Sequence, residues 1–173
     1  DFIRSVVGAK IPEDIIPLTI GGSEQLIDYA KVNDKYFINI MSLGFDAEVA
    51  YQTGHFKNLP LISGETAYVL GILTTIAICK YEHMTLKIDD DEFSGKYLLA
   101  AVGNGQYYGG GMHALPEAVI DDGLFDICFV EPKRRSQILR LFPQYMKGLH
   151  GSIEGVHFRR RSEEHTSELQ SRQ

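Results

Sequence analysis

The chain has 173 residues, 44% of them hydrophobic, with 17 basic against 23 acidic side chains and a net charge of −6. This length fits one domain with a substantial core. The acidic balance argues against a nucleic-acid partner, because such binding rests on neutralising phosphates. Cys79 and Cys128 are too few for a disulfide framework and wrongly spaced for a zinc site, so we expect reduced thiols in the cytoplasm.

The first third of the chain predicts a connection followed by strands. It begins at Asp1 without an initiator methionine or a signal-peptide pattern, which is typical of mid-protein sequence. From Gln25 to Val49, two β-rich runs flank Asn33-Asp34, a turn signal that predicts a hairpin. The second run, Tyr36 to Met41, should lead into a loop at Ser42-Leu43-Gly44.

The most apolar window, Thr66 to Cys79, predicts a helix that begins at Glu65. Its 14 residues fall short of the roughly 20 that a membrane-spanning helix needs. We therefore expect a buried helix.

Two strands should follow this helix. Met84, Leu86 and Ile88 alternate with polar residues, which predicts a half-exposed strand. The chain should then turn through an acidic stretch that ends at Gly95 and continue as a buried strand from Tyr97 to Val102.

Another strand and a helix are expected near the end of the domain. The run from Leu124 to Glu131 places Phe125, Ile127 and Phe129 on one face, with Asp126 and Cys128 on the other. A helix should run from Ser136, as its N-cap, to about Gly148, and Pro143 should kink or shorten it. Its expected apolar face consists of Ile138, Leu141, Phe142, Tyr145 and Leu149. Together these patterns predict an α+β fold.

The last segment, Arg161 to Gln173, is polar and shows neither strand alternation nor an apolar helical face. Its sequence, RSEEHTSELQSRQ, resembles the translation of a common sequencing adapter. We therefore expect residues 161–173 to be disordered adapter read-through and exclude them from the predicted fold. A natural disordered tail is the alternative.

Glycines and carboxylates gather between two of the predicted strands. Gly109, Gly110 and Gly111 allow positive φ, so this loop either turns tightly or binds an anion through its N–H groups. Side chains of adjacent extended residues point in opposite directions, so Asp121 and Asp122 are not expected to hold one ion together. One carboxylate with backbone carbonyls and water would suit magnesium. The alternative is an ordinary turn.

Three segments resemble the bacterial diacylglycerol kinase-like lipid kinases. GNGQYYGGGMHALPEAVIDDGLFD, from Gly103 to Asp126, is similar to a glycine cluster followed by the family pattern aPxAxxdDGxxD. DFIRSVVG resembles the continuation of the motif GTxNDFAR, and YFINIMSLGFDAEVA resembles FxNxxxxGfdAxV. The order and spacing agree, so the resemblance covers about Asp1 to Arg160.

The resemblance implies a β-rich, sandwich-like C-terminal domain with inserted helices, incomplete at both ends, in residues 25–160. Residues 1–24 would then connect it to a missing N-terminal nucleotide-binding domain. The family's GGDGT motif and the DGE motif that holds its general base do not occur here. For the intact parent, the resemblance implies transfer of the ATP γ-phosphoryl group to a lipid hydroxyl, such as that of diacylglycerol. It also implies a lipid substrate at the membrane surface, allows a homodimer, and predicts that the fragment is inactive.

The resemblance also implies roles for particular residues. Asp122 would supply a carboxylate oxygen to a structural Mg²⁺, and the carbonyls of Val119 and Leu124 would add two more ligands. Asp1 is what remains of the nucleotide-binding region. Asn104 would lie on the substrate side together with Gly109, Gly110 and Gly111, although hydrogen bonding within the core is an equal expectation for Asn104 and for Asn39.

Two other functions stay open from the sequence. A kinase for a soluble substrate, similar to NAD kinases, would also pair a nucleotide domain with a β-rich domain. A noncatalytic module that binds lipids or anions would explain the glycine loop without the absent motifs.

Overall fold

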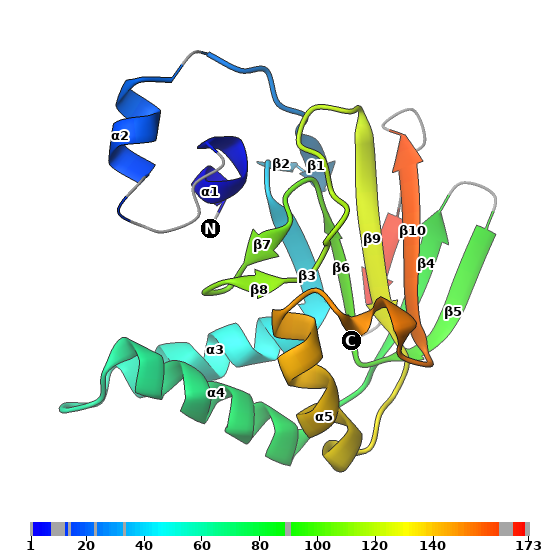
Figure 1. Cartoon of the computed structure of the whole chain (residues 1–173). Helices are drawn as coiled ribbons and strands as arrows, with labels where there is room; N and C mark the ends of the chain where they lie inside the picture. The colour runs from blue at the N-terminus through cyan, green and yellow to red at the C-terminus, as the bar shows by residue number, and fades with distance from the viewer. Residues whose placement is uncertain are drawn as a thin grey trace.

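The computed structural model describes residues 2–7, 13, 15–22, 24–32, 34–88, 91–162 and 168–171. Two short helices precede the strands, two longer helices follow β3, and one further helix follows β9 (Figure 1). The elements in chain order are α1 (Phe2–Val7), α2 (Ile15–Ile20), β1 (Ala30–Val32), β2 (Lys35–Phe37), β3 (Ile40–Gly44), α3 (Phe45–Lys57), α4 (Gly64–Ile78), β4 (Glu82–Ile88), β5 (Asp91–Tyr97), β6 (Leu99–Gly103), β7 (Tyr107–Tyr108), β8 (Met112–His113), β9 (Leu124–Val130), α5 (Arg135–Met146), the 3-10 helix η2 (His150–Ser152), β10 (Val156–Ser162) and β11 (Glu168–Ser171).

Two antiparallel sheets form the body of the molecule. One has four strands in the order β10-β9-β6-β3, and the other has three in the order β11-β4-β5. Leu98 links β5 of one sheet to β6 of the other, and its N–H donates to the carbonyl of Val130 at 2.8 Å. The chain therefore crosses between the sheets at this residue.

The core has two parts, one on each face of the four-stranded sheet. Phe129 and Ile127 of β9 pack with Met84 and Leu86 of β4 between the two sheets. The other face is covered by α3, α4 and α5, and here Cys128 belongs to the cluster. The predicted division of the β9 side chains between two faces is confirmed, and so is the α+β, sandwich-like class with helices.

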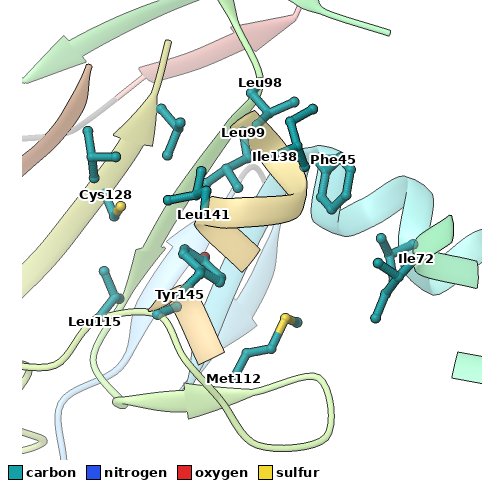
Figure 2. Close-up of a cluster of buried hydrophobic side chains, with 14 of the residues drawn as sticks. Phe45, Ile72, Leu98, Leu99, Met112, Leu115, Cys128, Ile138, Leu141 and Tyr145 are labelled. Carbon is teal, nitrogen blue, oxygen red and sulfur yellow. The ribbon is translucent and has the colours of Figure 1, made fainter. Parts of the chain in front are cut away.

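Helix α5 contributes its predicted face to the helix-covered part of the core. Figure 2 shows Ile138, Leu141 and Tyr145 of α5 in this cluster. Leu149 instead lies beyond the end of the helix and is 62% exposed. Its predicted place on the apolar face is therefore wrong.

The ends of α5 also differ from the prediction. The N-cap is Arg134 rather than Ser136, and its backbone N–H donates to Oε1 of Gln137 at 2.8 Å. The Gln137 side chain thus satisfies the backbone N–H of Arg134 at the start of the helix. Pro143 lies inside the helix, which ends at Met146, slightly before the predicted Gly148.

The hairpin around Asn33-Asp34 is confirmed by the pairing of β1 with β2, although Asn33 lies outside the described residues. The predicted loop at Ser42-Leu43-Gly44 is wrong. These residues belong to β3, which pairs with β6 from Ile40 opposite Gly103 to Gly44 opposite Leu99. The partner strand supplies the hydrogen bonds, which a local turn signal cannot reveal.

Helix α3 was not predicted. It starts directly after β3, and its buried residues include Phe45, Val49 and Thr53, which recur every four positions. Gly44 is its N-cap, with φ +84°. Thr53 is polar and the next position of this series is the exposed Lys57, so the apolar stripe is short and the sequence signal is weak.

Helix α4 is confirmed close to its predicted bounds. Ser63 is its N-cap and accepts a hydrogen bond from the N–H of Thr66 at 3.2 Å. The expectation of a fully buried helix is wrong, because Val69 and Leu73 are about half exposed. Only one side of α4 packs against α3 and the core. Within the described residues, no helix is long and apolar enough to cross a membrane.

Strand β4 matches the prediction, with Met84 and Leu86 buried, and β6 is buried along its whole length. The predicted start of the buried strand at Tyr97 is wrong, because Tyr97 ends β5 and β6 begins at Leu99. The side chain of Ile88 lies outside the description. The acidic turn that was expected to end at Gly95 is wrong, because β5 already begins at Asp91 and pairs with β4. The cross-strand ladder holds these acidic residues extended.

Both ends of the chain contain regular structure. The predicted connection, residues 1–24, contains α1 and α2, and α2 has no buried residue. The expected disorder from Arg161 onward differs from the structure, since β10 extends to Ser162 and β11 pairs with β4. The edge of β4 offers backbone groups that the four residues of β11 satisfy.

Candidate functional site

The three consecutive glycines form the turn between β7 and β8. Their φ angles are +54° at Gly109, +88° at Gly110 and +101° at Gly111. The N–H of Gly111 donates to the carbonyl of Tyr108 at 3.1 Å and closes the turn. The positive φ expected of these glycines is confirmed, and we call residues 107–113 the glycine hairpin.

Asn39 and Asn104 join this hairpin and the acidic turn to the sheet. Nδ2 of Asn39 donates to the carbonyl of Tyr107 at 3.1 Å. Nδ2 of Asn104 donates to the carbonyls of Asp28 at 3.1 Å and Ile120 at 2.8 Å, and the residue is fully buried. Both side-chain amides therefore donate hydrogen bonds to backbone carbonyls around the candidate site. The predicted substrate contact of Asn104 stays a prediction.

The acidic pair sits in an exposed turn at the start of β9. Oδ2 of Asp121 accepts from Nε2 of Gln25 at 3.0 Å, whereas Oδ1 of Asp122 accepts from the N–H of Leu124 at 3.0 Å. The two side chains thus contact different partners. The tight bend lies at Gly123, whose φ is +70°.

Two residues at this turn were not singled out by the sequence. Oδ2 of Asp28 accepts from the N–H of Gly123 at 2.7 Å. Arg160, in β10, places Nη2 3.9 Å from Oδ2 of Asp122 and Nε 3.2 Å from Oδ2 of Asp126. Burial raises the pKa of the Asp126 carboxyl, and Arg160 opposes this shift. Each contact joins distant parts of the chain, so no local motif signals it.

The acidic turn offers one carboxylate to a metal ion. Among the described residues, no three His, Cys, Asp or Glu side chains lie close enough to hold a metal together. A hard cation at Asp122 would therefore depend on backbone carbonyls and water. The oxygen chemistry of this turn and the partial exposure of Asp122 fit magnesium. In the structure, the cation that faces Asp122 is the Arg160 guanidinium.

A further carboxylate, Asp46, lies buried beneath the glycine hairpin and was also not singled out. The Tyr108 hydroxyl donates to Oδ2 of Asp46, and the Tyr145 hydroxyl donates to the same oxygen at 3.4 Å. Burial raises the pKa of the Asp46 carboxyl to about 6, although both hydrogen bonds lower it. The GFDA motif contains this residue, but a buried partner is visible only in three dimensions.

A hollow of about 270 Å³ opens elsewhere, between β3, the first turn of α3 and β4. Its lining consists of Leu43, Gly44, Ala47, Glu48, Glu82 and Met84. None of the predicted site residues lines it. Its two glutamates would repel a phosphate, so it does not suit a nucleotide.

The structure brings the predicted residues together only in part. Asn104 adjoins the acidic turn through Ile120, and Asn39 links the same strand end to the glycine hairpin. Val119 is exposed and Leu124 half-buried at the two sides of the acidic turn. Asp1 lies outside the described residues.

The segment that contains the sandwich strands, the glycine hairpin and the acidic turn matches a known protein family. Residues 39–169 match the model of the YegS C-terminal NAD kinase beta sandwich-like domain. The chain belongs to this family. The match runs from residue 39, just after β2, to residue 169, and it includes the helices inserted after β3.

Curated relatives of this YegS-type domain carry kinase names. A protein from Pectobacterium atrosepticum named "Probable lipid kinase YegS-like" is 38% identical over 128 residues, which is 73% of this chain and 42% of the relative. A "Diacylglycerol kinase" from Staphylococcus saprophyticus is 28% identical over 163 residues, 92% of this chain and 52% of the relative. The chain thus spans about half the length of these relatives. The resemblance to bacterial diacylglycerol kinase-like lipid kinases is confirmed.

Solved structures agree on the fold. A protein from Bacillus anthracis described as a "putative diacylglycerol kinase" superposes with a TM-score of 0.66 at 22% identity. The match covers 100% of this chain and 55% of that chain. The YegS-type domain thus has the architecture of one part of a larger molecule.

Proposed function

We propose that this domain belongs to an ATP-dependent lipid kinase that transfers the γ-phosphoryl group of ATP to a lipid hydroxyl, such as that of diacylglycerol. The observation that carries the proposal is the family match over residues 39–169, which includes the glycine hairpin and the acidic turn. The names of the relatives support the reaction class.

In this reaction, the lipid hydroxyl oxygen forms a bond to the γ-phosphorus, and the bond from that phosphorus to the bridging oxygen of ADP breaks. A general base accepts the hydroxyl proton. We place the base and the nucleotide motif in a part of the protein beyond this chain, and Asp1 next to the nucleotide. The role of this domain is to bind and orient the acceptor lipid, with Asn104 and Gly109 to Gly111 on the substrate side.

The acidic turn would hold a structural Mg²⁺ through the Asp122 carboxylate and the carbonyls of Val119 and Leu124. Such an ion would supply positive charge that stabilises the turn at the start of β9. To accept it, the Asp122 carboxylate must share or exchange its contact with Arg160. Asp28 keeps the turn in place through the N–H of Gly123.

The test is phosphoryl transfer from labelled ATP to diacylglycerol in mixed micelles with Mg²⁺. We expect turnover by the intact protein, which should contain GGDGT upstream and a DGE-like motif downstream, and none by the 173-residue chain alone. Intact protein without turnover on any lipid hydroxyl would refute the proposal. We further propose that the intact protein works in the cytoplasm at the membrane periphery, and vesicle flotation would measure its binding to the membrane. We also propose that it forms a homodimer, and light scattering would measure its oligomeric state.

A kinase for a soluble substrate is the second candidate, because the description of the matching family refers to the NAD kinase β-sandwich. The same assay with NAD in place of diacylglycerol separates the two. Phosphorylation of NAD but not of the lipid would favour this candidate.

We also propose that residues 161–173 are adapter read-through. A genomic read from an independent library should replace EEHTSELQS by other sequence. If that read retains EEHTSELQS in frame, the segment is part of the natural protein.

A further inference from the structure

The glycine hairpin has little backbone support of its own. Its strands are two residues each, paired as Tyr107 with His113 and Tyr108 with Met112. The connecting glycines all adopt positive φ and bring no side chains to pack. The position of such a hairpin therefore depends on the side chains that flank it.

On the strand side, the Tyr107 ring stacks on the His113 ring at a centroid distance of 4.2 Å, and Asn39 binds the Tyr107 carbonyl. On the helix side, the Tyr108 hydroxyl donates to Asp46 and lies 3.0 Å from the Tyr145 hydroxyl. Asp46 belongs to the first turn of α3, and Tyr145 to the last turn of α5. Three elements thus meet at one buried carboxylate.

We propose that Asp46, Tyr108 and Tyr145 form a latch that holds the glycine hairpin against α3 and α5, and that ionisation of Asp46 loosens it. Asp46 is thereby a positioning residue for the hairpin. A buried carboxylate is costly when charged, and among the described residues its hydrogen-bond donors are the two tyrosine hydroxyls. Opening the hairpin removes Tyr108 and admits water, which lowers the cost of the charge.

Of Asp46 and the described titratable groups that face it, Asp46 is the one that changes its charge near neutral pH. These groups are Tyr108 of β7, Tyr145 of α5, Tyr68 of α4 and Cys128 of β9. Burial raises the pKa of each of them, to about 12 for Tyr68. They stay neutral, so the closed hairpin is most stable when Asp46 is protonated and loosens as pH rises through about 6.

Hydrogen exchange of a peptide spanning residues 105–115, corrected for intrinsic rates, measures the latch in this chain. Between pH 5 and pH 7.5 we expect protection to fall by about tenfold. Asp46→Asn should remove this pH dependence and give more protection than the wild type at pH 7.5. Peptides from β6 and β9 report global unfolding and should stay protected.

Two tyrosine variants separate the latch from general packing. Tyr108→Phe should lower protection at both pH values, because it removes the donor to Asp46. Tyr68→Phe is the matched control, since its buried hydroxyl has no hydrogen-bond partner among the described residues, and it should behave like the wild type. If His113, whose pKa burial lowers, caused the pH dependence, Asp46→Asn would retain it. That result, or pH-independent wild-type protection, would overturn the proposal.

The catalytic consequence rests on the proposed lipid kinase function. In the intact protein, Tyr108→Phe should raise KM for diacylglycerol by about tenfold and leave KM for ATP unchanged. An intact protein that lacks lipid kinase activity would refute the proposed function, while the exchange experiment would still decide on the latch. An unchanged KM for diacylglycerol in an active Tyr108→Phe enzyme would refute the positioning role.

Discussion

Asp46 and Asp122 are carboxylates in opposite surroundings. Asp46 is 6% exposed and bonded to two tyrosine hydroxyls, whereas Asp122 lies in an exposed turn beside Arg160. Burial disfavours the charge of Asp46, whereas the Asp122 carboxylate is partly exposed and lies 3.9 Å from the Arg160 guanidinium. The same type of side chain therefore suits an internal latch at Asp46 and a cation site at Asp122.

The buried Asp46 predicts how stability depends on pH. Its pKa rises from 3.8 in the unfolded chain to about 6 in the fold, so its contribution is complete below about pH 4 and is lost as pH rises to about 6. Between pH 4 and pH 7, the wild type should lose up to about 3 kcal/mol relative to Asp46→Asn. Urea unfolding of both proteins at each pH measures this difference. A constant difference would contradict the assignment.

Asp122 predicts a magnesium effect in the intact protein. Asp122→Asn keeps the shape of the side chain but removes its formal charge, so activity should fall by at least tenfold and recover in part at high Mg²⁺. Asp121→Asn is the matched control, because Asp121 contacts Gln25 instead. Initial rates across a magnesium series measure both variants. Equal losses of activity in the two variants would indicate that the segment is an ordinary turn.

The junction of β3 and α3 depends on one backbone conformation. Gly44 has φ +84°, and the next N–H, of Phe45, donates to the carbonyl of Leu98 at 2.9 Å. A Cβ at this position would come within 2.5 Å of the same carbonyl oxygen. The glycine thus lets the chain pass directly from the sheet into the helix that carries Asp46.

This junction predicts opposite effects for two glycines. Gly44→Ala should destabilise the fold by about 2 to 3 kcal/mol, through a strained φ and a backbone clash. Gly54→Ala is the control inside α3, where a Cβ meets nothing within 4 Å, and it should stabilise by about 0.5 to 1 kcal/mol. Thermal or urea unfolding compares the two. A neutral Gly44→Ala would show that the junction can relax.

Across the molecule, large apolar side chains remain exposed on two helices. Ile16 and Ile20 of α2 are largely exposed, and the outward residues Val69 and Leu73 of α4 are about half exposed. Both helices lie on the outside of the molecule, away from the space between the two sheets (Figure 1). Apolar surface of this kind favours association.

We therefore expect the 173-residue chain to self-associate. Replacing Val69 and Leu73 together by Gln should increase the monomer fraction in sedimentation velocity, because it removes apolar surface from α4. Ala77→Gln, at an exposed position of the same helix, removes little apolar surface and should have a small effect. A wild-type chain that sediments as a sharp monomer and melts cooperatively would contradict this expectation.

Local patterns were sufficient for elements whose signal is periodic and continuous. The alternation of Phe125, Ile127 and Phe129 placed β9 between two core layers, and the spacing of Ile138, Leu141 and Tyr145 gave the buried face of α5. The motif around the glycines and acidic residues gave the family. All these signals lie within a few residues of one another, so the sequence by itself determined them.

Only the tertiary structure decided the features that depend on distant partners. The loop predicted at Ser42 to Gly44 is a strand because β6 pairs with it, and α4 is half exposed because it packs on one side only. Asp46 became a candidate through Tyr108 and Tyr145, which are 62 and 99 residues away along the chain. The physical reason is that burial and hydrogen bonding are set by which surfaces meet in space, and no local pattern of residues records those meetings.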